Sequence, residues 1–215
     1  MQYLFTCKQE GNMGLHVGDN PINVQKNREA LRDSLGISKL IFMNQVHGDE
    51  VVCVDEDTLT PTCDAMISQS KNVALAVMVA DCIPLLFYDA LTQSIGVAHA
   101  GRAGSALSLS VKTLHAMQKN FGVMPQSVEV YIGPCIGKCC YEVGKEVCAG
   151  LEHVLHVKQE ALFLDLPKAN IQALCEAGVL EKNIHDKTLC TCCSSEYFSY
   201  RREKITGRFV GVIRL

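Results

Sequence analysis

The sequence predicts a mixed α+β fold, with mixed β-sheets layered with helices, in a single domain that covers residues 1–215. Residues 73–79 and 85–88 form continuous apolar runs, which is typical of strands buried on both faces. Amphipathic segments separate only some of the apolar runs, whereas others follow one another across short turns, so the pattern does not favour a regular doubly wound sheet. No linker, low-complexity segment or internal repeat interrupts the chain.

Shorter strands are expected around polar turns. Residues 40–43 and 51–54 flank the polar turn at residues 45–49, and residues 95–98 lead into a turn that contains glycine. Two further segments have the composition of strands: residues 128–132 and 209–213.

Three helices are expected from amphipathic patterns and their end signals. The first covers residues 21–35. The second has Ser105 as its N-cap and ends at Gly122, since serine and glycine favour these two positions. The third begins at Pro167, a residue suited to a first helical turn, and ends near Gly178.

Composition and charge exclude several classes of protein. Twenty basic and twenty-three acidic residues give a net charge of −3 without a basic stripe, so nothing favours binding to nucleic acid. The most apolar stretch, residues 73–88, is interrupted by Asp81 and Pro84 and does not read as a membrane span. The first ten residues lack the features of a signal peptide, and we therefore expect a cytoplasmic protein without a membrane partner.

The chain has twelve cysteines, which we expect to remain free or to bind metal in a reducing compartment. Two groups stand out, Cys139-Cys140 and the cysteines at 190, 192 and 193. We expect adjacent cysteines to be poorly suited to bind one tetrahedral ion together. We therefore interpret these residues as buried free thiols near the functional site and not as a second metal centre.

Three candidate functional residues, His47, Cys82 and His99, stand at the ends of predicted strands, where loops expose side chains on a rigid frame. Cys82 follows an acid, Asp81, in the most apolar region of the chain. Burial of that carboxylate is costly unless it is paired or supports a metal ligand. His99 begins a turn that contains glycine and leads into a helix.

The residue types alone leave three uses open for this set. A thiolate and two imidazoles suit zinc and leave a fourth position for water or substrate. Alternatively, Cys82 acts as a nucleophile with His99 as its base, as in a thiol hydrolase. The same set also suits copper for electron transfer if a methionine lies on the axis. Spacing cannot decide among these uses, because the three residues are far apart in the sequence.

Several motifs in order resemble the laccase-domain family of the YfiH type, formerly called polyphenol oxidase and now assigned purine nucleoside phosphorylase activity. The motifs are GLHVGD (residues 14–19), NQVHG (44–48), ADCIP (80–84), HAG (99–101), IGPCIGKCCYEVG (132–144), FSYRR (198–202), TGR (206–208) and IRL (213–215). The resemblance covers nearly the whole chain. It implies a sandwich fold of the type shared by YfiH and the cytotoxic necrotizing factor CNF1.

The resemblance also implies a zinc ion held by His47, Cys82 and His99. It further implies phosphorolysis of adenosine, inosine, guanosine and methylthioadenosine, with deamination of adenosine as a possible second activity. The expected partners are then a purine nucleoside and phosphate, in a monomer or homodimer. Copper is the alternative metal, and the alternative functions are a polyphenol oxidase or a Cys-His hydrolase that edits peptidoglycan precursors.

We also predict four substrate-binding residues: Gln45, Asp81, Arg102 and Arg201. Arg201 and Arg202 are candidates for contacts with phosphate or ribose, with a structural salt bridge as the alternative. The family commonly has Trp-Arg after His-Ala-Gly, whereas this chain has Arg102-Ala103, so the arginine is displaced by one position. The other histidines are interpreted as surface residues: His16, His115, His153, His156 and His185.

Overall fold

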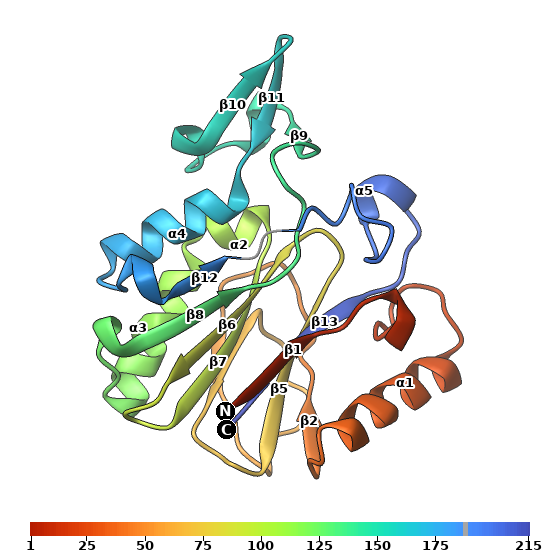
Figure 1. The fold of residues 1–215 in the computed structure, drawn as a ribbon, viewed down its shortest axis with the longest axis vertical. Helices are drawn as coiled ribbons and strands as arrows, with labels where there is room; N and C mark the ends of the chain where they lie inside the picture. The colour runs from red at the N-terminus through yellow and green to blue at the C-terminus, as the bar shows by residue number, and fades with distance from the viewer. Residues whose placement is uncertain (187–188) are drawn as a thin grey trace.

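The computed structural model describes residues 1–186 and 189–215, and two β-sheets face each other at its centre (Figure 1). The first has the order β1 (Gln2–Phe5), β13 (Phe209–Arg214), β5 (Val73–Val79) and β2 (Lys39–Ile41). The second has the order β12 (Ile184–Asp186), β8 (Val128–Ile132), β6 (Ile83–Asp89), β7 (Ser94–Ala100), β4 (Ala65–Ser68) and β3 (Val51–Cys53). Both sheets mix parallel and antiparallel pairs.

Strand β5 shows why its sequence is apolar throughout. Successive side chains of a strand point to opposite faces. Leu75 and Val77 pack between the two sheets with Leu86 of β6, whereas Ala74 and Ala76 face the opposite side of their own sheet. Both faces of β5 are therefore buried.

Helices cover the outer face of each sheet, giving four layers. On one side, Leu31 of α1 (Pro21–Ser34) packs with Ala74 and Ala76 of β5. On the other, Leu114 and Met117 of α3 (Leu109–Phe121) pack with Phe87 of β6. In Figure 1, α1 and α3 stand on opposite sides of the strands.

The remaining elements are short or lie at one end of the sandwich. A small third sheet projects at the top of Figure 1 and contains β10 (Leu155–Lys158), β11 (Ala161–Leu164) and β9 (Glu142–Val143). The other helices are α2 (Arg102–Ala106), α4 (Leu166–Glu176) and α5 (Tyr200–Glu203). Short 3₁₀ helices cover Lys8–Glu10, Pro125–Ser127, Lys145–Val147, Glu152–Val154 and Glu181–Asn183. None of the helices in the described part of the chain combines the length and apolar character needed to cross a membrane.

The predicted α+β class is confirmed, but the predicted start of one helix is wrong. The segment expected to run unbroken from Ser105 to Gly122 is divided into α2 and α3, because Ser108 adopts a left-handed conformation with φ 57°. Ser105 lies inside α2, where its hydroxyl accepts a hydrogen bond from Asn170 instead of capping the helix. The predicted end at Gly122 is confirmed, and that glycine has φ 70°.

Candidate metal centre

The chain crosses from one sheet to the other between the end of β5 and the start of β6, and the candidate site lies at this crossing. Cys82 occupies the crossing segment itself, and His99 is on the adjacent strand β7, where it pairs with Pro84 of β6. His47 comes from the loop that follows β2. The structure brings a ligand atom of each of the three residues within 4.8 Å of the other two.

Two of the backbone positions that shape this site are unusual. His47 has φ 59° and Asp81 has φ 90°, values that residues other than glycine rarely adopt. Such conformations persist only where the surroundings enforce them, and they are common at functional sites. His47 is itself a candidate ligand, and Asp81 directly precedes the candidate ligand Cys82.

Asp64 enforces the conformation of the His47 loop. Its carboxylate is fully buried and accepts hydrogen bonds from three successive backbone N–H groups, those of Val46, His47 and Gly48, at 3.1, 3.0 and 2.7 Å. The same carboxylate lies 2.9 Å from Nδ1 of His99. A carboxylate on Nδ1 directs the other ring nitrogen to a metal and fixes the orientation of the ring. Asp64 therefore positions two of the three ligands.

Cys82 and His99 each shift the pKa of the other. Burial raises the pKa of the Cys82 thiol, but the imidazoles of His99 and His47 outweigh burial and lower the pKa below its ordinary value. Burial likewise lowers the pKa of His99, but the Cys82 sulfur and the Asp64 carboxylate outweigh it and raise the pKa. Both shifts favour the charged forms of the two groups, and the thiolate is the form of cysteine that binds a metal.

Gly101 allows the sulfur to reach this position. A Cβ atom at residue 101 would lie 2.6 Å from Sγ of Cys82, closer than two such atoms approach. The backbone of Gly101 is in an ordinary extended conformation, with φ −75° and ψ −173°. The glycine is thus required by space and not by its backbone angles.

A pocket of about 410 Å³ opens above the three residues. Three positively charged side chains line it, Arg201, Lys204 and Arg208, and His16 lines it in addition to the two histidines of the site. Its other walls include apolar and aromatic side chains: Met78, Val79, Ile136, Leu166, Tyr141 and Tyr200. The volume lies within the range of about 300–1,000 Å³ that is usual for small-molecule sites.

Comparison with known proteins agrees with this architecture. A model of the family described as "Multi-copper polyphenol oxidoreductase laccase" matches residues 5–215. The chain belongs to this laccase family. Purine nucleoside phosphorylase SCO2081 of Streptomyces coelicolor is 34% identical over 215 residues, covering 96% of this chain and 88% of that relative. Purine nucleoside phosphorylase YfiH of Escherichia coli is also 34% identical, covering 95% and 86%.

Solved structures show the same laccase-family fold. Hypothetical protein YfiH of Bacillus licheniformis superposes with a TM-score of 0.92 at 31% identity, covering 98% of this chain and 91% of that one. YlmD from Geobacillus stearothermophilus superposes with a TM-score of 0.88 at 32% identity, covering 94% and 84%. The resemblance read from the sequence motifs is therefore confirmed.

The predicted substrate-binding residues of this laccase-family chain occupy different positions. Gln45 lines the pocket, but its amide hydrogen bonds to the backbone N–H and carbonyl of Met78, at 2.9 and 2.8 Å. Arg102 is not among the residues that line the pocket, and its guanidinium donates to the carbonyl of Val147 at 3.3 Å. Arg202 donates to four carbonyl groups of residues 191–197 and thereby supports the loop before α5.

Asp81 and Arg201 are joined to each other. The Asp81 carboxylate accepts hydrogen bonds from the Thr191 hydroxyl and from the backbone N–H of Arg201, both at 2.6 Å. The Arg201 guanidinium lines the pocket and also donates to the carbonyls of Cys140 and Glu142, at 3.2 and 2.9 Å. Asp81 is therefore paired, as burial of its carboxylate requires.

Several residues of the site were missed in the sequence. Asp64 carried a signal, because it is an acid directly before the apolar residues 65–67. The basic residues Lys204 and Arg208 and the aromatic residue Tyr200 follow or belong to the FSYRR and TGR motifs. His16, interpreted as a surface residue, is exposed but also lines the pocket.

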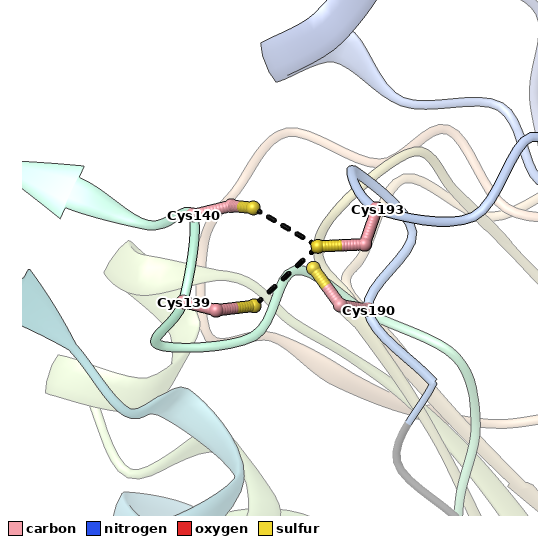
Figure 2. Close-up of side chains that lie close together, drawn as sticks. All are labelled: Cys139, Cys140, Cys190 and Cys193. Atoms are coloured by element: carbon pink, nitrogen blue, oxygen red, sulfur yellow. Dashed lines mark hydrogen bonds between the residues drawn. The ribbon is translucent and has the colours of Figure 1, made fainter.

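The interpretation of the clustered cysteines as buried thiols is wrong. Cys139 and Cys193 are exposed, and Cys140 and Cys190 are partly exposed. The four sulfur atoms lie within 4.8 Å of one another (Figure 2), although they come from two loops about 50 residues apart. The interpretation also overlooked that Cys190 and Cys193 are separated by two residues, which is the Cys-x-x-Cys spacing of many zinc sites.

Proposed function

We propose that the chain is a zinc-dependent purine nucleoside phosphorylase of the cytoplasm that uses adenosine, inosine, guanosine or methylthioadenosine, and that it also deaminates adenosine. The observation that carries the proposal is the meeting of His47, Cys82 and His99 at a pocket whose rim is basic and whose walls are partly apolar. Relatives named purine nucleoside phosphorylase cover almost the whole chain.

The donor set suits zinc. Three ligands of the types Cys and His, with a buried carboxylate behind one histidine, match a catalytic zinc site that keeps one position free. When bound, zinc would act as a Lewis acid on phosphate or water. A copper site for electron transfer would need an axial methionine, and Met78 lines the pocket. The sulfur of Met78, however, accepts a hydrogen bond from Nη2 of Arg28 at 3.4 Å. Because this sulfur already has a partner, the donor set favours zinc over copper.

The pocket walls match the two parts of the substrate pair. Positively charged side chains attract phosphate, and Arg201, Lys204 and Arg208 supply them. A purine ring is flat and largely apolar, and Met78, Ile136 and Tyr141 offer surfaces on which it can pack.

In the proposed phosphorolysis, a phosphate oxygen forms a bond to the anomeric carbon of the ribose. The bond from that carbon to the purine nitrogen breaks, the purine keeps the electron pair and takes up a proton, and ribose 1-phosphate is formed. In the deamination, water adds to the purine ring and ammonia leaves. The role of the protein is to hold both reactants in one orientation, which by itself accelerates such a step.

The test is to incubate the purified protein with adenosine, with and without phosphate, and to quantify adenine, ribose 1-phosphate and inosine. We expect adenine only with phosphate, and inosine in both cases. Cys82→Ala should remove both products, whereas Cys53→Ala, at an exposed cysteine of β3 outside the pocket, should retain them. Adenine release that does not depend on phosphate would contradict phosphorolysis.

A second candidate is oxidation of phenols by a copper form, which the description of the family favours. Multi-copper oxidases typically hold several copper ions with His-x-His pairs, and the chain contains no such pair. Copper-loaded protein that oxidises a phenol with dioxygen, while zinc-loaded protein lacks nucleoside turnover, would establish this candidate instead.

A third candidate is a thiol hydrolase, favoured by the arrangement of Cys82, His99 and Asp64, in which the cysteine interacts with the histidine and the carboxylate lies at Nδ1 of that histidine. Metal analysis separates it from the first. Protein that contains no zinc at this site, and that loses activity when Cys82 alone is alkylated, would support the hydrolase.

A further inference from the structure

Four cysteine sulfurs converge outside the pocket. Cys139 and Cys140 lie on the loop between β8 and β9, and Cys190 and Cys193 lie on the segment between β12 and α5. Sγ of Cys193 is 3.7 Å from that of Cys139 and 3.3 Å from that of Cys140, and Figure 2 shows all four side chains pointing to a common centre. Zinc bound tetrahedrally at about 2.3 Å from each sulfur places the sulfurs about 3.8 Å apart.

We propose that these four cysteines bind one zinc ion in a closed structural site, separate from the site at His47, Cys82 and His99. All pairs of sulfur atoms are within 4.8 Å, so movements of about 1 Å or less bring them to the spacing of a tetrahedral site. Four protein ligands leave no open position, which is typical of structural zinc.

The backbone prepares the two loops for this arrangement. The N–H groups of Cys140 and Tyr141 both donate to the carbonyl of Gly137, at 2.9 and 3.0 Å, and this turn brings two adjacent cysteines to one side. The N–H of Gly137 donates to Sγ of Cys190 at 3.3 Å, an interaction that favours a thiolate. A side chain at residue 137 would lie 3.3 Å from the sulfur of Cys139, so glycine leaves room for the sulfur atoms.

Main-chain hydrogen bonds already join the loops beside the sulfurs. The N–H of Cys135 donates to the carbonyl of Leu189 at 3.2 Å, and the N–H of Thr191 donates to the carbonyl of Cys135 at 2.9 Å. The arrangement of the cysteines therefore rests on backbone pairing and not only on flexible side chains.

The surroundings also suit the charge of such a site. Zinc with four thiolates carries a net charge of about −2. Arg201 donates to the carbonyl of Cys140, and Arg202 donates to the carbonyls of Thr191 and Cys192, at 3.2, 2.6 and 3.2 Å. Two guanidinium groups thus lie against the cysteine loops, where they would offset the excess negative charge.

The site would stabilise one wall of the pocket. Thr191, between Cys190 and Cys193, donates to the carboxylate of Asp81, the residue before Cys82. Tyr141, which follows Cys140, lines the pocket. A zinc ion that clamps the two loops would therefore hold both Thr191 and Tyr141 in place.

The test measures zinc by elemental analysis in protein prepared under reducing conditions. Cys82→Ala serves as the background, because it removes a ligand of the other centre and makes the result independent of the proposed enzymatic function. We expect about one zinc per chain in this background and none after the further changes Cys139→Ser and Cys193→Ser. The matched control makes the further changes Cys53→Ser and Cys175→Ser, which also remove two thiols, and should retain the ion.

A second measurement does not depend on how the serine variants fold. Cobalt(II) added to metal-free Cys82→Ala protein should give strong thiolate-to-cobalt absorption and the visible bands of a tetrahedral site. Zinc should protect the four thiols from alkylation and raise the Tm by about 10 °C at saturation.

Three results would each overturn the proposal. The first is equal rates of alkylation of these four thiols with and without zinc. The second is a disulfide between Cys140 and Cys193 in protein prepared with reductant. The third is an iron chromophore at these cysteines in place of zinc.

Discussion

Asp64 holds Nδ1 of His99 at 2.9 Å and, with the same carboxylate, accepts the backbone N–H of His47 at 3.0 Å. One buried acid thus connects two ligands that are 52 positions apart. Burial raises the pKa of Asp64, but the bond to His99 and those from the backbone of Gly48 and Val46 outweigh it and lower the pKa, so the group is a carboxylate at neutral pH.

Replacement of Asp64 by asparagine should therefore weaken metal binding. The amide group has one acceptor oxygen, so it cannot accept all four hydrogen bonds, and the His99 ring loses its fixed orientation. We expect the affinity for zinc to fall about 10–100-fold, measured by competition with a chromophoric chelator. The matched control is Asp89→Asn, at another fully buried aspartate, which accepts hydrogen bonds from Thr92 and not from the site. An equal loss of zinc in both variants would show that burial, and not the contact with His99, explains the effect.

Gly101→Ala should displace the Cys82 sulfur, because the added Cβ would lie 2.6 Å from it. The backbone angles of Gly101 are available to alanine, so the fold should tolerate the change. We expect loss of most bound metal at this centre and at least a tenfold fall in turnover. Gly36→Ala provides the contrast, since Gly36 has φ 61° and open space around it. That variant should lose about 1 kcal/mol of stability and retain its metal.

The elements that could be predicted from the sequence are those whose local pattern and tertiary environment agree. The strand at residues 73–79 was predicted with its observed bounds. Both of its faces are buried, so its sequence is a continuous apolar run that can be recognised without the structure. Strands 40–43 and 51–54 were also predicted. They flank one turn but do not pair with each other. β2 joins β5 and β3 joins β4, in different sheets.

The candidate ligands could be identified from their positions at the ends of predicted strands. The sequence did not predict that they lie close together, nor that Asp64 positions two of them. Asp64 contacts His99 because β4 pairs with β7, with Ala65 opposite Ala98, so that the carbonyl of Asp64 accepts the His99 N–H at 2.8 Å. This register depends on contacts about 35 residues apart. The break at Ser108 likewise has no local signal, because the residues on both sides favour helix.

Lys204→Met should weaken the use of phosphate in particular. Lys204 lines the pocket, and methionine keeps most of the length of its unbranched side chain while it removes the charge. Because Lys204 is exposed, its contribution is modest, and we expect the KM for phosphate to rise about fivefold at low salt with little change in the KM for adenosine. The control is Lys182→Met, at an exposed lysine outside the pocket. If the two KM values rose together, Lys204 would act on the shape of the pocket and not on phosphate.

Glu203→Gln should destabilise the protein at neutral pH and less so in acid. Burial raises the pKa of Glu203, but Lys8, Thr206 and Arg202 outweigh it and lower the pKa from 4.5 to about 2. Its carboxylate lies 2.6 Å from Nζ of Lys8 and 2.8 Å from Nη2 of Arg202, tying the N-terminal segment to α5. A lowered pKa means that the stabilisation is complete above pH 4.5 and is lost as the pH falls towards 2.

Because Glu203 is partly exposed to solvent, we expect a loss of only about 1 kcal/mol in the free energy of unfolding at pH 7. The difference between variant and wild type should shrink steadily below pH 4.5, as measured by urea unfolding across this range. Glu176→Gln, at an exposed glutamate near the end of α4, should change the stability little at any of these pH values. A difference at Glu203 that persisted undiminished at pH 2.5 would mean that shape or packing, and not the charge of the carboxylate, stabilises this junction.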